Sequence, residues 1–215
     1  MKTLQFKLLI SEKDIDHAIS SRDFGSMKNK DGTIDYTNLN KFLKTVDIPI
    51  NPVSMEQVHG ERIGVVNDNK LALIENVDGL ITNKKNIALC VFTADCLPIL
   101  FFDKNKKIIA IVHAGRKGLL KGVIENMLKK LKEQFLSNLL DIIVGIGPGI
   151  EKKCYQVDGQ FIDIRKIAIE LLLNNGIKKE NIENLDICTK CNKDLFYSYR
   201  GENNNNRFVS VISMS

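Results

Sequence analysis

The sequence has no tryptophan and only four prolines among 215 residues, and aromatic side chains make up 7% of it. Its longest apolar stretches, 87–102 and 139–150, are interrupted by Asp or Gly and fall short of the roughly 20 residues that a membrane span needs. The apolar run within residues 1–14 is broken by charges and has no small-residue cleavage site, which argues against a signal peptide. These absences predict a cytoplasmic protein without a membrane segment.

Linkers and internal repeats are missing as well. The low-complexity run of four asparagines at 203–206 is typical of a turn. With 44% hydrophobic and 27% charged residues, the composition lies near the globular average, which excludes a disordered, collagen-like or coiled-coil chain. We therefore expect one domain over residues 1–215, with a core large enough to need no disulfides.

Charge of one sign is not concentrated anywhere in the sequence. The formal net charge is +5, and the lysines are scattered in short groups such as 104–107 and 178–179. No basic stripe alternates with aromatic residues, so these lysines are expected to lie on solvated surfaces and nucleic acid is not an expected partner. The charge pattern does not exclude small ligands that carry phosphate.

The sequence has five cysteines, an odd number, and the chain is expected in the cytoplasm. In that compartment, free thiols or metal ligands are favoured over a disulfide framework. The CTKC motif at 188–191 is a single CxxC without a second pair, which is weak evidence for zinc or redox chemistry. A structural role for this motif is favoured.

Hydrophobic spacing alternates between that of helices and that of strands. Helices are predicted over 35–46, 118–135 and 159–174. Strands are predicted over 2–10, 63–66, 71–74, 87–92, 97–103, 108–113, 142–150 and 207–213. The GIGPGI segment ending at residue 150 lacks the Lys-Ser/Thr of a P-loop and is predicted to be a tight turn after a strand. Runs of antiparallel-type strands with helices between them predict an α+β fold.

Two of the three histidines, His59 and His113, are followed by glycine directly or after one alanine. A histidine at the end of a strand and close to glycine lies where a ligand can approach the backbone, although a structural histidine fits this pattern too. Cys96 follows Asp95 in an apolar run, where a carboxylate is costly unless it is paired or functional. The set admits a three-ligand zinc site with an open fourth position or a cysteine nucleophile with a histidine base. Spacing does not choose between them, and Cys96 alone could also be a buried structural residue.

Six segments occur in the order found in one known family: QVHG (57–60), DGLIT (78–82), TADCLPIL (93–100), VHAGRKGL (112–119), GPGIEKKCYQV (147–157) and CTKCNKDLFYSYR (188–200). The segments SSRDFG (20–25) and NLN (38–40) also fit, so the likeness spans nearly the whole chain. On these motifs the sequence resembles the YfiH family, also called the multicopper polyphenol oxidase or laccase-like family and more recently purine nucleoside phosphorylases. The TADC and HAG pair is the most diagnostic.

The resemblance implies a mixed-sheet α+β sandwich with flanking helices, shared with bacterial deamidase toxins. It also implies a zinc site of His59, Cys96 and His113, with phosphorolysis of adenosine, inosine and methylthioadenosine and deamination of adenosine. The older laccase label implies copper and phenol oxidation. A further interpretation is a cysteine hydrolase or peptidoglycan-precursor editing factor that uses Cys96 and His113. Because a laccase needs several coppers and many more than three histidines, zinc is favoured over copper.

The implied activities suggest roles for further residues. Asp95 is our candidate for the carboxylate that shuttles a proton during deamination, on its adjacency to Cys96 alone. Phosphorolysis needs a cationic clamp, for which Arg22, Arg116 and Arg200 are candidates. The expected partners are purine nucleosides and phosphate, and no obligatory protein partner is readable from the sequence.

Two departures from the family pattern bear on substrate contacts more than on metal binding. Arg116-Lys117 stands where the family usually has Trp-Arg after HAG, so the aromatic side chain is lost. Asn205-Asn206 stands where the family usually has Thr-Gly before its arginine. His17 matches a recurring N-terminal histidine but is not expected to be a ligand.

Overall fold

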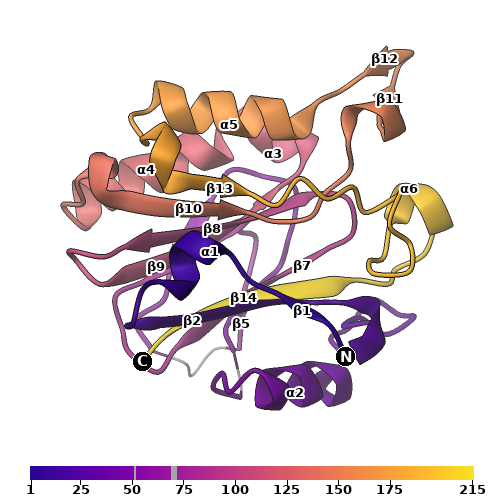
Figure 1. Cartoon of the computed structure of the whole chain (residues 1–215), viewed down its shortest axis with the longest axis horizontal. Coiled ribbons are helices and arrows are strands. Elements are labelled where there is room, and N and C mark those ends of the chain that lie inside the picture. Colours follow the sequence, from indigo (N-terminus) through magenta and orange to yellow (C-terminus); the bar gives the residue numbers. More distant parts are fainter. Residues whose placement is uncertain (51, 69–71) are drawn as a thin grey trace.

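The computed structural model describes residues 1–50, 52–68 and 72–215. Within these residues, a six-stranded sheet and a four-stranded sheet lie face to face, and helices cover their outer faces (Figure 1). The six-stranded sheet consists, in spatial order, of β13 (Ile182–Asn184), β10 (Ile142–Ile146), β8 (Leu97–Asp103), β9 (Ile108–Ala114), β6 (Gly79–Thr82) and β4 (Ile63–Val65). The four-stranded sheet consists of β1 (Thr3–Leu4), β2 (Ile15–Ser20), β14 (Phe208–Met214) and β7 (Ala88–Thr93).

The helices form the two outer layers. The six-stranded sheet is covered by α3 (Arg116–Lys121), α4 (Val123–Gln134) and α5 (Ile164–Asn174), whereas α2 (Tyr36–Thr45) packs on the four-stranded sheet. Short elements complete the fold: α1 (Lys7–Ile10), α6 (Tyr199–Glu202), the single turns η1 (Arg22–Phe24), η2 (Leu139–Asp141), η3 (Lys152–Cys154) and η4 (Lys179–Asn181), and the small strand pairs β3 (Ser54–Met55) with β5 (Leu73–Ile74) and β11 (Gln156–Val157) with β12 (Gln160–Phe161). This arrangement confirms the predicted α+β class with mixed sheets and flanking helices.

Strand β8 shows why the apolar runs of the sequence do not alternate between apolar and polar residues. Ile99 and Phe101 pack into the core beneath the helices, whereas Leu100 and Phe102 pack into the core between the sheets. Successive side chains of a strand point to opposite faces, so a strand covered on both faces is apolar throughout. Each of these side chains, when fully buried, contributes about 1.5–3 kcal/mol to stability.

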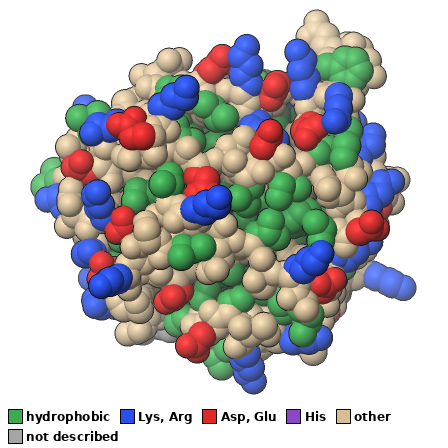
Figure 2. All heavy atoms as spheres, viewed as in Figure 1, with side chains coloured by type: hydrophobic (Ala, Val, Ile, Leu, Met, Phe, Trp, Pro, Cys, Tyr) green, Lys and Arg blue, Asp and Glu red, His purple; other side chains and the backbone are tan. Residues whose placement is uncertain are grey.

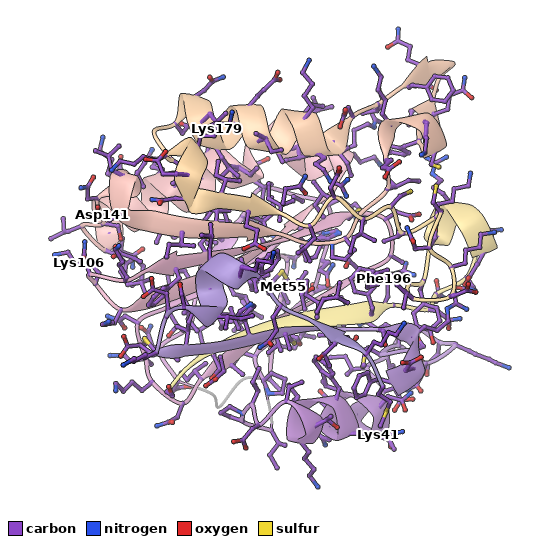
Figure 3. The ribbon with its side chains drawn as sticks, viewed as in Figure 1. Lys41, Met55, Lys106, Asp141, Lys179 and Phe196 are labelled. Atoms are coloured by element: carbon purple, nitrogen blue, oxygen red, sulfur yellow. The ribbon has the colours of Figure 1, made fainter. Side chains whose placement is uncertain are left out.

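The surface has the mixed charge that the sequence predicts. Figure 3 shows Met55 and Phe196 in the interior, whereas Lys41, Lys106 and Lys179 lie at the periphery. On the face seen in Figure 2, lysines and arginines are interspersed with aspartates and glutamates. Among the described residues, none of the helices has the length and apolar character that a bilayer crossing demands.

The opening strand predicted over 2–10 is wrong beyond its first residues, since β1 is short and Lys7–Ile10 is helical. The N–H of Phe6 donates to Nε2 of His17 at 2.8 Å, and the N–H of Leu8 donates to Glu183 at 2.8 Å. Because side chains rather than a neighbouring strand accept these bonds, the chain leaves the sheet and turns into a helix.

The helix predicted over 118–135 is divided into α3 and α4. Gly122, with a φ of 98°, adopts the left-handed conformation that ends one helix, and the next begins directly after it. The strand predicted over 142–150 ends at Ile146, where the glycine-rich segment leaves the sheet.

The helix predicted over 159–174 begins late, at Ile164. The Asp163 side chain accepts the N–H of Lys166 at 2.9 Å and caps this helix, while the residues before it form the hairpin β11–β12. The other predicted elements are confirmed within two residues at each end: 35–46, 63–66, 87–92, 97–103, 108–113 and 207–213. The predicted strand 71–74 lies partly outside the described residues, at residue 71. One domain over 1–215 stays a prediction.

Candidate active site and metal centre

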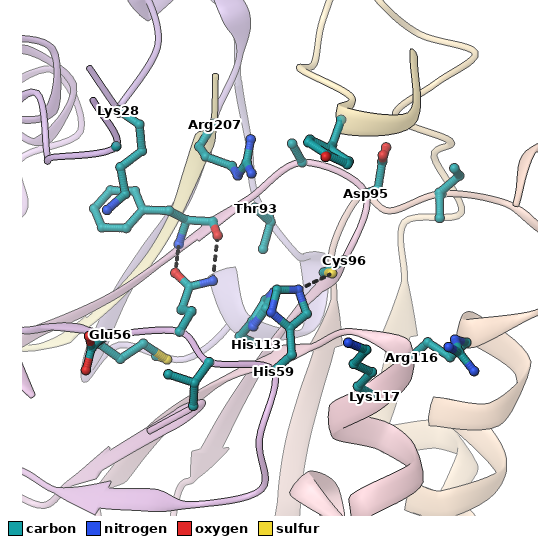
Figure 4. A pocket seen from close by; sticks show the side chains of 18 of the residues that line it. Lys28, Glu56, His59, Thr93, Asp95, Cys96, His113, Arg116, Lys117 and Arg207 are labelled. Carbon is teal, nitrogen blue, oxygen red and sulfur yellow. Dashed lines mark hydrogen bonds between the residues drawn. The ribbon is translucent and has the colours of Figure 1, made fainter. Parts of the chain in front are cut away.

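Three segments bring the predicted ligands together. The pairing of β8 with β9 places Pro98 opposite His113, so Cys96, just before β8, lies beside the end of β9. His59 is on the loop after β3 and has a positive φ of 56°. The ligand atoms of His59, Cys96 and His113 lie within 4.8 Å of one another, with 3.9 Å between Cys96 Sγ and His59 Nε2 (Figure 4). This group could hold a metal ion.

The burial of the three residues is graded. His113 is buried, Cys96 is half-buried and His59 is exposed, and the two imidazole rings meet edge to face with centroids 4.8 Å apart. A set of two imidazoles and one thiolate suits zinc and leaves a fourth position on the exposed side. The convergence therefore fits the ligand set that the family resemblance implies.

Gly115 of the HAG motif leaves room for this group. A Cβ atom at this position would lie 2.8 Å from Cys96 Sγ and 3.1 Å from a ring carbon of His59. Both distances are shorter than van der Waals contact, so any larger residue would displace the candidate ligands. The close approach of the candidate ligands therefore accounts for the glycine of HAG.

Asp78 joins two of the candidate ligands, and the sequence reasoning missed it. Its buried carboxylate lies 2.7 Å from His113 Nδ1 and accepts the backbone N–H groups of Val58, His59 and Gly60 at 3.2, 3.0 and 2.6 Å. Burial would raise the pKa of Asp78, but the hydrogen bonds from His113 and from Gly60 lower it, so the group is a carboxylate. The contact with Nδ1 leaves Nε2 of His113 free to act as a ligand or a base.

The electrostatics of the pair favour charge separation. Burial opposes ionisation of both groups, yet the mutual attraction of Cys96 and His113 lowers the pKa of Cys96 to about 6 and raises the pKa of His113 to about 9. Asp78 adds to the shift of His113. Cys96 is therefore a thiolate near neutral pH, which is the form that binds metals and attacks electrophiles.

Asp95, the predicted proton shuttle, is held by three donors. Its carboxylate accepts the hydroxyls of Thr189 and Ser198 at 2.7 Å each and the backbone N–H of Arg200 at 2.6 Å. The residue has a φ of 95°, and its carboxylate points away from the Cys96 sulfur in Figure 4. These bonds tie the turn that carries Cys96 to the C-terminal segment, an arrangement that favours a positioning role for Asp95.

A cavity of about 1000 Å³ opens over the His–Cys–His group. Beside aliphatic side chains, its lining includes cations and aromatic rings: Lys28, Phe92, Arg116, Lys117, Tyr155, Tyr199, Arg200 and Arg207. Such a volume fits a small-molecule ligand, and the mixture of cations and aromatic rings suits an anion next to a flat ring. Lys117 as well as Arg116 lines the cavity, so the departure from the family's Trp-Arg keeps positive charge in this wall.

The predicted arginines differ in their positions. Arg116 and Arg200 line the cavity, but Arg22 lies outside its described lining. Arg22 pairs with Glu202 and lies over the ring of Tyr197, 4.3 Å from its centroid. Its guanidinium is therefore engaged in joining segments far apart in the sequence, which favours a structural role.

Three cations of the cavity were absent from the predicted set, and Lys117 is one of them. Lys28 lies over the Phe92 ring at 5.0 Å, and the guanidinium of Arg207 is held by the carbonyls of Asn204 and Asn206 at 3.2 and 2.8 Å. Arg207 had a signal in the sequence, because it follows the asparagine run that departs from the family pattern. Lys28 had none, since it lies in an irregular polar segment.

Comparison with known proteins places the chain in a family. Residues 17–163 and 158–215 match the family of multi-copper polyphenol oxidoreductase laccases. The chain belongs to this family. A purine nucleoside phosphorylase from Clostridium acetobutylicum is 32% identical over 194 residues, which cover 81% of this chain and 80% of that protein. A purine nucleoside phosphorylase from Campylobacter jejuni is 35% identical over 178 residues, which cover 74% and 76%.

Two solved structures share the fold. YlmD from Geobacillus stearothermophilus superposes with a TM-score of 0.87 at 23% identity, over 94% of this chain and 92% of that chain. The Bacillus licheniformis hypothetical protein YfiH superposes with a TM-score of 0.85, over 94% and 93%. The predicted YfiH-type fold is therefore confirmed.

Proposed function

We propose that this protein is a zinc-dependent purine nucleoside phosphorylase that acts on adenosine, inosine and methylthioadenosine and also deaminates adenosine. The observation that carries the proposal is the meeting of His59, Cys96 and His113 at the wall of a cavity lined by cations and aromatic rings. The relatives named purine nucleoside phosphorylase support it. A cytoplasmic location stays a prediction from the sequence.

The metal is proposed to be zinc and not copper. Two imidazoles and a thiolate fit a single zinc site, and three histidines in the whole chain are too few for several coppers. A bound zinc ion would supply Lewis-acid chemistry at the open position. Asp78 keeps Nε2 of His113 available there by holding Nδ1, and it holds the His59 loop through three backbone N–H groups.

Phosphorolysis forms a bond between a phosphate oxygen and C1′ of the ribosyl group and breaks the bond from C1′ to the purine nitrogen. The chain's part is to bind the phosphate and to orient the base. Arg116 and Arg200, the predicted clamp residues that line the cavity, can neutralise the phosphate together with Arg207. Tyr155 and Tyr199 offer rings on which a purine can stack.

Deamination of adenosine is the second activity in the proposal. It needs a carboxylate that moves a proton between the attacking water and the leaving amine. Asp95 stays our candidate, although its three hydrogen bonds must rearrange before it can reach a substrate.

The test is an assay of the purified protein with inosine or adenosine and phosphate, before and after removal of metal by a chelator. We expect hypoxanthine or adenine together with ribose 1-phosphate, loss of this activity on chelation and its recovery with zinc but not copper. Cys96→Ser should lower the activity more than about 100-fold, because it removes the thiolate ligand.

Cys90→Ala is the matched control for this assay. Cys90 lies in the core against α2, and burial raises its pKa to about 12, so it is an inert thiol away from the site. It should keep wild-type activity within about threefold. Absence of ribose 1-phosphate from fully metal-loaded protein would overturn the phosphorylase proposal.

A second candidate is supported by the charge separation at Cys96. Cys96, His113 and Asp78 are arranged as nucleophile, base and orienting carboxylate, which is the pattern of a cysteine hydrolase. The peptidoglycan-precursor editing interpretation belongs to this class. Hydrolase activity that survives thorough chelation and is lost in Cys96→Ser would favour this candidate over the zinc enzyme.

A further inference from the structure

A second group of thiols lies outside the cavity. Cys154 ends the turn η3, and Cys188 and Cys191 belong to the CTKC motif. The three sulfur atoms lie within 4.8 Å of one another, with 3.3 Å between Cys154 and Cys191, and all three cysteines are free. The proposed function uses none of them.

The spacing of these sulfurs suits a metal ion better than a covalent bond. Zinc binds thiolates at about 2.3 Å, so two sulfurs of a tetrahedral site lie about 3.8 Å apart, whereas a disulfide needs about 2.05 Å. The observed separations, 3.3 Å for one pair and at most 4.8 Å for all, bracket the zinc value. Small side-chain rotations would bring all three sulfurs to zinc distance.

Backbone N–H groups point at the most buried sulfur of the group. Cys188 Sγ accepts the N–H of Glu151 at 3.5 Å, and it also accepts the N–H of Cys191 within the CTKC motif. Donors aimed at a sulfur stabilise the thiolate, which is the form that binds metal. Lys153 pairs with Glu151 at 3.1 Å and also lies close enough to Cys154 and Cys191 for their charges to attract.

The segments that carry the thiols are held in place without the metal. Gly149 and Cys188 form an isolated parallel bridge, and the buried Arg165 donates to the carbonyl of Ile187 at 3.0 Å and to Asp186 at 2.7 Å. The burial of the sulfurs is graded from the buried Cys188 to the exposed Cys191, so an ion can enter from the solvent side. The group is therefore preorganised and accessible.

We propose that Cys154, Cys188 and Cys191 bind a second zinc ion, independently of the His59–Cys96–His113 group. Binding converts three thiols to thiolates and releases their protons to solvent. The ion would clamp η3 to the CTKC loop. Because Tyr155 follows Cys154 in the cavity wall and Thr189 follows Cys188 and bonds to Asp95, this clamp would support one wall of the cavity.

The direct test is the zinc content of protein that has been stripped of metal, reloaded with zinc and separated from free ions. We expect two ions per wild-type chain and one ion in each of the variants Cys154→Ser and Cys191→Ser. Cys96→Ser should also hold one ion, and Cys96→Ser combined with Cys191→Ser should hold none. Cys90→Ala, which removes a thiol from neither group, should keep two.

Cobalt in place of zinc reports which sulfurs bind. Four thiolates are expected in the fully loaded wild type, three of them in this group, so Cys154→Ser and Cys191→Ser combined should lose roughly three quarters of the thiolate-to-cobalt absorption. Cys96→Ser should lose the remaining quarter.

Three results would overturn the proposal. They are a single zinc per wild-type chain that is lost in Cys96→Ser, unchanged zinc content in Cys191→Ser, and a Cys154–Cys191 disulfide in place of the second ion in protein handled under reducing conditions. Since Cys191 is exposed, its replacement by serine leaves the core intact, so a change in zinc content in that variant reports the site rather than unfolding.

Discussion

In the His59–Cys96–His113 group, His113 lies on a strand and Cys96 directly precedes one, whereas the three residues of the Cys154–Cys188–Cys191 group lie on turns and irregular segments. In the first group, the register of β8 with β9 sets the position of Cys96 beside His113, and one buried carboxylate, Asp78, holds His113 and the His59 loop. In the second group, backbone N–H groups and an isolated bridge hold the sulfurs.

This difference separates a site suited to chemistry from one suited to support. The first group combines two imidazoles with one thiolate and faces a cavity, so it has an open position and a place for a substrate. The second also supplies only three ligands, all thiolates, but none of them lines the cavity, and its proposed task is to hold two loops together. Rigid strands position reacting groups more closely than loops do, so the pairing of β8 with β9 gives the first group the more fixed geometry.

The largest effect that separates the two groups is expected from Asp78→Ala. The substitution leaves His113 and three backbone N–H groups without their acceptor, so we expect a loss of about 3–5 kcal/mol in the free energy of unfolding. Zinc affinity at the first group should fall about 10–100-fold, while the second group keeps its ion. Urea denaturation and zinc titration against a competing chelator measure the two effects.

Asp78→Asn is the milder companion of this variant, since it keeps the shape of the side chain and removes its charge. It should give the same direction of change with smaller loss of stability. An affinity at the first group within threefold of the wild type would show that the carboxylate does not organise the ligands, and the contrast between the two groups would fail.

A pH effect of the next size is expected from His17, which belongs to neither group. Burial lowers its pKa from 6.5 to about 4, and its Nε2 accepts the N–H of Phe6. As pH falls below about 6.5, His17 becomes protonated in the unfolded chain, whereas in the folded chain it stays neutral until about pH 4. Stability present above pH 6.5 is therefore lost on acidification, by up to about 3 kcal/mol.

His17→Gln isolates this contribution, because it removes the titrating group and can keep an acceptor for Phe6. The free energy of unfolding of metal-free wild type and variant, measured between pH 7 and pH 4, should fall more steeply in the wild type. Parallel curves for the two proteins would contradict the assignment.

The smallest of these effects is expected from Thr189→Val, at the residue that lies between the two groups. Thr189 follows Cys188 and donates its hydroxyl to Asp95 beside Cys96. Loss of this buried hydrogen bond should cost about 1–2 kcal/mol, with less than about threefold change in zinc affinity at either group. Thr189→Ser keeps the hydroxyl and is the control. A large loss of affinity at both groups in Thr189→Val would show that they act as one unit.

The motifs predicted which residues meet in the first group, but not what holds them. His59, Cys96 and His113 each lie in a motif of their own, so their convergence was expected from the family resemblance. Asp78 also lies in a motif, DGLIT, yet no local feature connects it with His113. That contact depends on the antiparallel pairing of β6 with β9, which also lets the N–H of His113 bond to the Asp78 carbonyl at 2.8 Å.

The arginines and the CTKC motif show the same limit. Arg22, Arg116 and Arg200 have the same chemistry, and only the folded chain puts two of them in the cavity and one on Glu202. A single CxxC was weak evidence because the third thiol, Cys154, is 37 residues from Cys191 in the sequence. The parallel bridge between Gly149 and Cys188 brings the two segments together.

Local chemistry was enough to predict the α+β class, the family and the candidate ligands, because side-chain character, hydrophobic period and short motifs can be read within a few residues of one another. The tertiary structure alone decided that Asp78 orients His113, that Asp95 is bonded to the C-terminal segment, and that Cys154 joins the CTKC motif. Each of these contacts joins segments that are distant in the sequence and depends on how the strands pair, so it forms only when the chain folds.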